Sequence, residues 1–184
     1  VKCAIVNAGA RALHTGLEYD QGWQGNAQFI FSILDELSGA GEHGGDYEGD
    51  DYEEFDVDMT FMPYSNPLIY NQTYVGRGAA TAIRMHNGAG GRIHNSLFLN
   101  FSLGIDFEDE DPCDAWELLL FGETLIQNNR FWAIGDSTGI SEMILYNEGF
   151  VFNGQSEVES HFTENNNFAA NPNVDYAFAT DAGL

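Results

Sequence analysis

The chain has 184 residues, 43% of them hydrophobic and 14% aromatic, which suffices for one buried core and argues against a disordered protein. Its 29 acidic and 6 basic residues give a net charge of −23, which repels nucleic acid and anionic membranes and attracts cations. No apolar run approaches the ~18 residues of a membrane-spanning helix. We therefore expect a single domain over residues 1–184, secreted or displayed on the cell surface, that neither binds nucleic acid nor inserts into a membrane.

The first segment, VKCAIVNAG (1–9), has the pattern of a strand already in progress, which favours a piece of a longer chain. Its Cys3 and the distant Cys113 belong to no CxxC motif, so a thiolate metal site is not expected. A disulfide between them and two free thiols both stay open.

The segment TGLEYDQG (15–22) alternates apolar and acidic residues as a half-buried strand does. In extended conformation Leu17 and Tyr19 point to one face and Glu18 and Asp20 point to the other. The two carboxylates are therefore expected on the outer surface.

An acidic insertion over about residues 39–62 contains DYEGDDYEEFDVD (46–58), with eight carboxylates in thirteen residues. Calcium prefers about six to eight oxygen ligands, and a loop with glycines beside it can supply them. The acids do not follow the order of an EF-hand loop. A calcium site and a solvated acidic loop both stay open here, and the candidate ligands are Asp46, Glu48, Asp50, Asp51, Asp56 and Asp58.

A degenerate repeat follows, with the pattern apolar–x–Asn–x–x–aromatic. Its copies are LIYNQTYVG (68–76), RIHNSLFLN (92–100), LIQNNRFWA (125–133) and FTENNNFAA (162–170), with asparagines at 71, 95, 128 and 165, and a fainter copy, GNAQFIF, has Asn26 and Phe29. In stacked parallel strands, the apolar positions would fill an interior and the asparagines would form a hydrogen-bonded ladder at a bend, where they tolerate left-handed backbone geometry. The repeat predicts an all-β, right-handed parallel β-helix, a solenoid of coils with inserted loops. An antiparallel sandwich is the alternative, but two-residue hairpin signals are few.

The segment LGIDFEDE (103–110) repeats the pattern of TGLEYDQG and leads into a second acidic insertion, 108–117. If both strands lie in one sheet, Asp106 and Glu108 fall in columns with Glu18 and Asp20. Stacked carboxylates repel unless a cation or protons lie between them. The columns therefore indicate further calcium ligands, an acid–base pair, or a solvated face.

Catalysis has weaker support in the residues. Arg84, Arg92 and Arg130 are the possible bases beside calcium-binding carboxylates. Arg84 and Arg92 flank a glycine turn in AIRMHNGAGGRIHNS (82–96), and the alternative for them is charge pairing with neighbouring acids. His86 and His94 could approach each other across the same turn as a transition-metal pair. Trp116 is the better surface candidate for stacking on a sugar. No catalytic residue is predicted.

One combination of segments resembles a known family. GLEYDQGWQGNAQFIF, GEHGGDYEGDD, PLIYNQTYVGRG and TAIRMHNGAGGRIHNSLFLNFSLGIDFED occur in this order and resemble exported β-helix proteins of Bacteroidetes and some other marine bacteria, over roughly residues 13 to 135. The resemblance implies the β-helix fold and an extracellular or surface location. It implies no catalytic residues, and Thr15 stands where that family has the first acid of DGLD.

We therefore expect a non-enzymatic extracellular or cell-surface structural or adhesive β-helix, stabilised by calcium. Its coils could stack end to end on another copy, giving a homo-oligomer or filament. The alternative is a carbohydrate-active β-helix, either a polysaccharide lyase or hydrolase or a carbohydrate-binding module.

Overall fold

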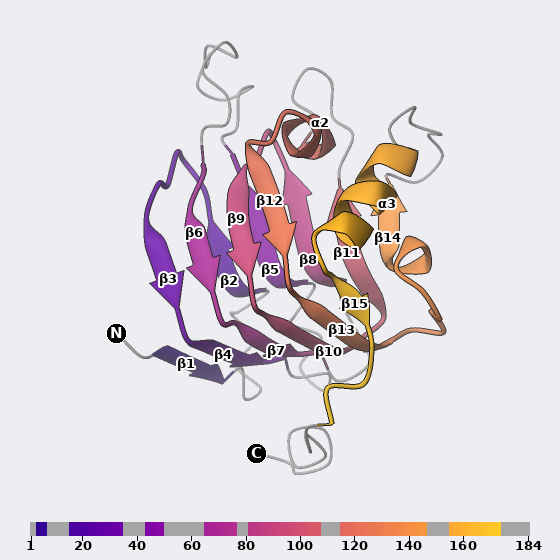
Figure 1. Ribbon diagram of the computed structural model, residues 1–184. Helices are drawn as coiled ribbons and strands as arrows, with labels where there is room; N and C mark the ends of the chain where they lie inside the picture. Colours follow the sequence, from indigo (N-terminus) through magenta and orange to yellow (C-terminus); the bar gives the residue numbers. More distant parts are fainter. Residues whose placement is uncertain are drawn as a thin grey trace.

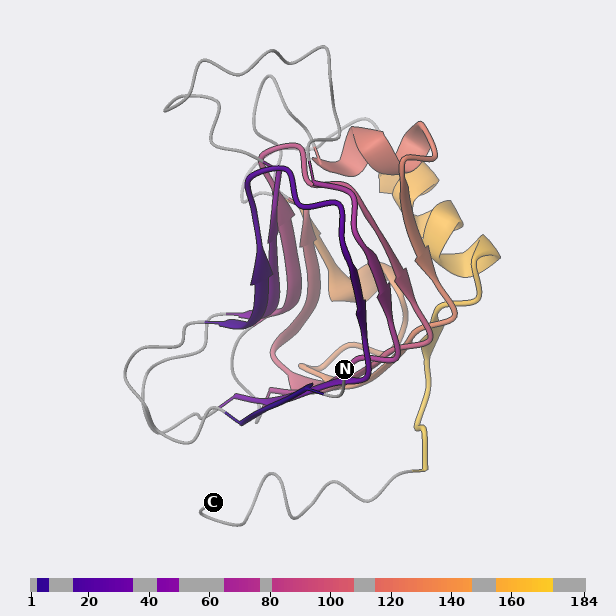
Figure 2. The same cartoon turned by 90° about the vertical axis from the view of Figure 1, so that its left-hand side faces the viewer.

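The structure is a computed structural model that describes residues 3–6, 15–34, 43–49, 65–76, 81–107, 115–146 and 155–173. Its strands pair in parallel within three sheets, and successive coils visit the sheets in the same order. The fold is a right-handed parallel β-helix, as the sequence predicts (Figure 1). Figure 2 looks along the helix and shows the three sheets around one interior.

Each coil passes from sheet B to sheet C to sheet A. Sheet B contains, in spatial order, β14 (Ile144–Tyr146), β11 (Leu103–Phe107), β8 (Thr81–His86), β5 (His43–Glu48) and β2 (Thr15–Tyr19). Sheet C contains β12 (Thr124–Gln127), β9 (Gly91–His94), β6 (Leu68–Tyr70) and β3 (Asn26–Gln28). Sheet A contains β1 (Cys3–Val6), β4 (Ile30–Ile33), β7 (Thr73–Val75), β10 (Leu97–Phe101), β13 (Arg130–Ile134) and β15 (Phe168–Ala169).

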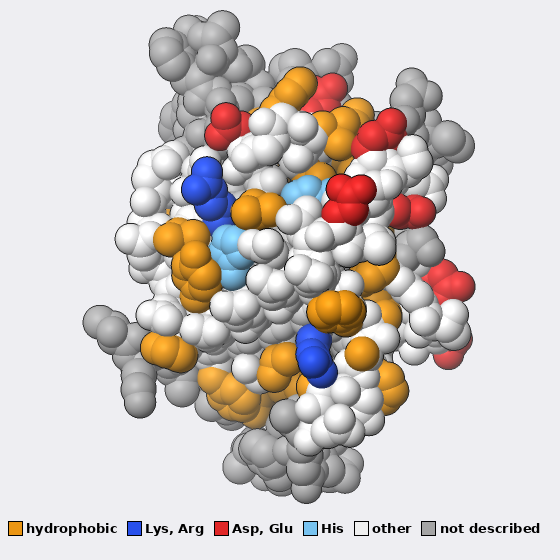
Figure 3. All heavy atoms as spheres, in the orientation of Figure 1, with side chains coloured by type: hydrophobic (Ala, Val, Ile, Leu, Met, Phe, Trp, Pro, Cys, Tyr) orange, Lys and Arg blue, Asp and Glu red, His pale blue; other side chains and the backbone are white. Residues whose placement is uncertain are grey.

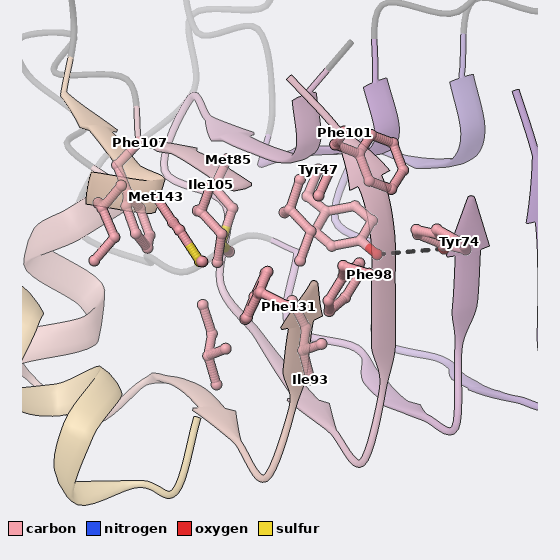
Figure 4. Packing of buried hydrophobic residues seen from close by; sticks show 14 of the residues in the cluster. Tyr47, Tyr74, Met85, Ile93, Phe98, Phe101, Ile105, Phe107, Phe131 and Met143 are labelled. Atoms are coloured by element: carbon pink, nitrogen blue, oxygen red, sulfur yellow. Dashed lines mark hydrogen bonds between the residues drawn. The ribbon is translucent and has the colours of Figure 1, made fainter. Parts of the chain in front are cut away.

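The interior is filled by columns of apolar side chains that the strand register aligns (Figure 4). Sheet B contributes Tyr19, Tyr47, Met85 and Phe107; sheet C contributes Ile69, Ile93 and Ile126; sheet A contributes Tyr74, Phe98 and Phe131. All ten are buried, and each large apolar side chain contributes roughly 1.5–3 kcal/mol on burial. The tyrosine hydroxyls keep partners inside the core: the Tyr47 hydroxyl donates to Gln72 Oε1 at 2.8 Å.

The bend from sheet C to sheet A is a single residue in left-handed conformation. Asn71, Asn95, Asn128 and Asn166 occupy it, with φ between 53° and 57°. Three of these asparagines were predicted, but the fourth copy was aligned one residue too early, at Asn165. The fainter copy was also out of register, because Phe29 itself takes the bend position, with φ of 60°.

The hydrogen-bonded ladder is formed by the residue after the bend, so the prediction of a ladder between the bend asparagines was wrong. This buried column is Gln72, Ser96, Asn129 and Asn167. Asn129 Oδ1 accepts from the Ser96 amide at 2.8 Å, and its Nδ2 donates to Ile93 O and Asn167 Oδ1. Of the bend asparagines, Asn95, Asn128 and Asn166 are exposed and Asn71 is half-buried.

The insertion predicted over 39–62 contains a core strand, β5. Glycines and acids are poor strand formers, which hid it in the sequence. Gly44 is required by packing, because a Cβ there would lie 2.6 Å from Ala82 O in the next strand. The rest of this insertion and residues 108–114 lie outside the described residues.

Two helices were not predicted. α2 (Ala115–Leu120) begins within the second insertion and packs Trp116 partly buried against the core, so Trp116 is not a free surface ring. α3 (Gln155–Glu164) comes between β14 of sheet B and β15 of sheet A, where each earlier coil has a sheet C strand; a short 3₁₀ helix, η3 (Ser141–Met143), precedes β14. Across the described ranges, no helix is long and apolar enough to cross a membrane.

Candidate functional site

The outer face of sheet B carries a row of charged side chains along the helix axis. The strand register aligns Glu18, Asp46, Arg84 and Asp106 on β2, β5, β8 and β11. Their common alternation with inward residues puts them on one face, about 4.8 Å apart from strand to strand. The prediction that Glu18 and Asp106 share a column is confirmed, and Arg84 lies in it between two aspartates.

Beside this row lies a hydrogen-bonded pair of ionisable groups. His86 Nε2 lies 3.1 Å from Asp46 Oδ1 and 4.0 Å from Glu48 Oε2. Asn87 Nδ2 donates to Glu48 Oε1 at 2.5 Å. His86 and Asn87 reach both carboxylates because β8 is the neighbour of β5, with His86 directly opposite Glu48.

Asp46 and His86 shift each other's pKa in opposite directions. Burial on its own would raise the pKa of Asp46, but the hydrogen bond and charge of His86, with the charges of His43 and Arg84, outweigh it and lower the pKa. Burial and Arg84 oppose the protonated form of His86, while Asp46 and Glu48 favour it more strongly, so the pKa of His86 is raised. Asp46 is therefore ionised near neutral pH and is a poor proton donor.

The predicted calcium ligands are only partly described. Glu18, Asp20, Asp46, Glu48 and Asp106 are in place on sheet B or directly after β2, whereas Asp50, Asp51, Asp56, Asp58 and Glu108 lie outside the described residues. Within the described ranges, no three His, Cys, Asp or Glu side chains are arranged to hold a metal ion. The chain's own His86 and Asn87 engage Asp46 and Glu48, so calcium here stays a prediction that depends largely on the acids beyond β5.

The other histidine of the glycine turn has a different setting. His94 lies on the outer face of sheet C and stacks on Tyr70, with ring centroids 4.8 Å apart. His86 and His94 thus have separate partners on separate sheets, and the structure does not bring them together as a metal pair.

The contribution of Arg84 and His86 to this face was not assigned from the sequence. A signal for it exists in TAIRMHNG (81–88), where Arg84 and His86 are two residues apart and therefore share a strand face. The register between β5 and β8 could not be predicted, because β5, which brings Asp46 beside Arg84 and His86, was taken for a loop.

Comparison with known proteins identifies a family. A family model described as a pectate-lyase-like β-helix domain matches residues 5–177. No match was found among curated proteins or among solved structures.

Proposed function

The chain belongs to the family of pectate-lyase-like β-helix domains, and from this premise we propose that it is a non-enzymatic polysaccharide-binding module of a secreted or cell-surface protein. The observation that carries the proposal is the charged row on the outer face of sheet B. Such a row runs parallel to the helix axis, so an extended polymer can contact several strands at once.

The chemistry of the row suits an acidic polysaccharide. Arg84 offers a forked donor for a sugar carboxylate, and His86 and Asn87 add polar groups next to it on β8. Bound calcium would bridge the protein carboxylates to those of the polymer and offset their repulsion. The ligands proposed for that ion are the acids of β2, β5 and β11 with those that follow β5.

Cleavage is the second candidate, and the spacing of two carboxylates favours it. The strands that carry Asp46 and Asp106 are two strand spacings apart, roughly 9.6 Å, just above the ~6.5–9.5 Å separation of carboxyl groups in inverting glycosidases. Such enzymes need one acid with a raised pKa. The pKa of Asp46 is lowered, so Asp46 could act only as the base of such a pair, and cleavage would require Asp106 as the acid.

The experiment measures retention of the protein in native gels that contain a de-esterified polyuronate, with calcium or with excess chelator. We expect retention that depends on calcium. Arg84→Gln should weaken it by about tenfold, because a charged hydrogen bond contributes roughly 1.5 kcal/mol. Arg130→Gln is the matched control, since Arg130 is exposed on sheet A and its loss changes the net charge equally.

Products are measured on the same samples as new reducing ends and as the ultraviolet absorbance of unsaturated uronates. The proposal expects none. Release of products that Asp106→Asn abolishes would replace the binding module with an enzyme. Equal retention of wild type and Arg84→Gln would remove the sheet B face as the binding site.

A further inference from the structure

The two helices that interrupt the β-helix enclose a groove on its surface. α2 and α3 pack against each other beside β12, and an open groove with a volume of about 420 Å³ lies between them. Leu119 and Leu120 line it on the side of α2, and Leu120 is 42% exposed. Glu157, His161 and Glu164 line it on the side of α3. These three positions share one face of α3, so the groove follows that helix for about two turns.

The end of α2 holds an aromatic side chain in solvent beside the groove. Phe121 is 74% exposed, the largest exposed fraction among the large hydrophobic side chains that the structure describes. Its backbone is fixed by a Schellman motif, in which the amides of Glu123 and Gly122 donate to the carbonyls of Leu118 and Leu119 at 2.9 and 3.3 Å. Gly122 has a φ of 77°, which glycine adopts without strain. Phe121 is therefore a preorganised anchor for a partner.

The groove is acidic and has no cation of its own. Glu157 and Glu164 are exposed, and the sequences 115–123 and 155–164, which form the two helices and the turn after α2, contain no Lys or Arg. Burial lowers the pKa of His161 to about 4, so its imidazole is neutral at pH 7. Figure 3 shows acidic and hydrophobic side chains together over α2 and α3, while the basic side chains in view lie over sheets C and A.

Charge and backbone hydrogen bonding distinguish between the occupants that such a groove could take. A second copy of the chain would bring the same glutamates and another net charge of −23, and like charges oppose that contact. An extended peptide would leave backbone groups without partners, because the backbone groups of α2 and α3 bond within their own helices. A helix satisfies its own backbone, and basic side chains on it would meet the glutamates.

We infer that the groove between α2 and α3 binds a cationic amphipathic helix of another protein. The apolar stripe of that helix packs on Leu119, Leu120 and Phe121. Its basic side chains lie two turns apart and pair with Glu157 and Glu164, which are two turns or about 10 Å apart along α3. This site goes beyond the proposed polysaccharide binding, because it lies on the two helices and involves neither the sheet B row nor calcium.

The test is the fluorescence anisotropy of a labelled probe peptide of about 18 residues, titrated with the intact chain in excess chelator. The probe has leucines at i, i+3, i+4 and i+7 and lysines two turns apart beside them, and the control peptide has the same composition in scrambled order. Phe121→Ser should raise the Kd of the probe by about tenfold. Phe168→Ser is the matched control, because it removes a ring that is 48% exposed on β15, and it should leave the Kd within about twofold.

A second pair of variants tests the charge of the groove. Glu164→Gln should raise the Kd of the probe by about threefold, because it removes one of the two carboxylates that meet the lysines. Asp136→Asn removes the same charge from an exposed position in the loop after β13 and should leave the Kd within about twofold. All four substituted side chains are exposed, so the variants should keep the melting temperature of the wild type within a few degrees.

The inference would be overturned by no binding of the probe, by equal binding of the scrambled peptide, or by equal losses in Phe121→Ser and Phe168→Ser. Sedimentation velocity of the chain alone provides a further check. A dimer that Phe121→Ser dissociates would assign the groove to a second copy and overturn the inference as well. Failure of the sheet B proposal is a separate result, because Arg84→Gln acts on retention by the polyuronate and calcium, which are absent from this titration.

Discussion

Two columns of polar residues lie next to each other at the bend between sheets C and A, and they stabilise the chain in different ways. Asn128 and its equivalents adopt positive φ, which costs most residues ~1–2 kcal/mol and asparagine less. Asn129 and its equivalents are buried and hydrogen-bond from coil to coil. Adjacent asparagines of the same sequence motif therefore respond differently to substitution.

Asn129→Ala is predicted to lower the free energy of unfolding by about 2–4 kcal/mol, because it leaves the Ser96 amide and Ile93 carbonyl without their partner in the interior. Asn128→Gly is the control and should change stability by less than about 0.5 kcal/mol, since glycine accepts the same φ. Urea unfolding followed by circular dichroism measures both. An equal loss in the two variants would contradict the division of roles.

The bend column was readable in the sequence because few residues tolerate positive φ, so asparagine recurs there. The ladder column was not, because Gln72, Ser96, Asn129 and Asn167 share hydrogen-bonding capacity and no common side chain. In the run Asn165–Asn166–Asn167 the sequence offers three equivalent choices. Only the pairing of β13 with β15 selects Asn166 for the bend.

At the scale of elements, α3 stands where the next strand of sheet C would lie and covers the edge of β12. His161 Nε2 accepts the Ile126 amide at 3.3 Å, the Asn128 amide donates to Asn165 O, and Asn167 Nδ2 donates to Ile126 O. Val158 and Phe162 anchor the helix in the core. End-to-end stacking stays a prediction, and through this edge of sheet C it would require α3 to move.

The hydrogen bond that His161 accepts, together with the burial of its ring, predicts that the free energy of unfolding depends on pH. Burial lowers the pKa of His161 to about 4, against about 6.5 in the unfolded chain, so the unfolded state takes up a proton first as the pH falls. Stability from this group is present above about pH 6.5 and is lost towards pH 4. Relative to His161→Gln, wild type should lose about 1 kcal/mol between about pH 7 and pH 5, after allowance for partial exposure.

His86→Gln supplies a control of opposite sign. The raised pKa of His86 means that its contribution is present below about pH 6.5 and lost as the pH rises through the folded value. Urea midpoints over the same pH series therefore diverge for the two variants. Parallel pH profiles would show that the net charge of the chain, and not these two histidines, sets the dependence.

Some of the elements could be predicted from the sequence and others could not. The strands with apolar alternation and the coil repeat were predicted, and so was the shared column of Glu18 and Asp106. β5 was not, because its inward positions include glycines, which neighbouring side chains cover. The candidate site depends on that strand, since it alone places Asp46 beside Arg84 and His86.

For the whole molecule, the large negative charge opposes the compact fold. The net charge of −23 destabilises the compact state by self-repulsion, and few of the 6 basic residues are available to offset it. On sheet B, Asp46 and Asp106 flank Arg84 and Glu48 lies opposite His86, whereas the cluster that follows β5 has no basic residue in its sequence from 49 to 64. A bound divalent cation would reduce that repulsion, and this leads to a prediction about metal.

Calcium is predicted to raise the melting temperature by about 5–10 °C over the same protein in excess chelator. A ligand at a hundred times its Kd stabilises by about 2.7 kcal/mol, and a domain of this size gains roughly 2–4 °C per kcal/mol. Magnesium at equal concentration carries the same charge, but it demands near-octahedral geometry, which a flexible acidic segment supplies poorly. The difference between the calcium and magnesium shifts in melting temperature therefore separates coordination from charge screening. Asp50→Asn with Asp51→Asn should remove most of the calcium shift and leave the magnesium baseline unchanged. Equal shifts with both ions would mean that the acidic segments are solvated surface and that the β-helix depends on its apolar and asparagine columns alone.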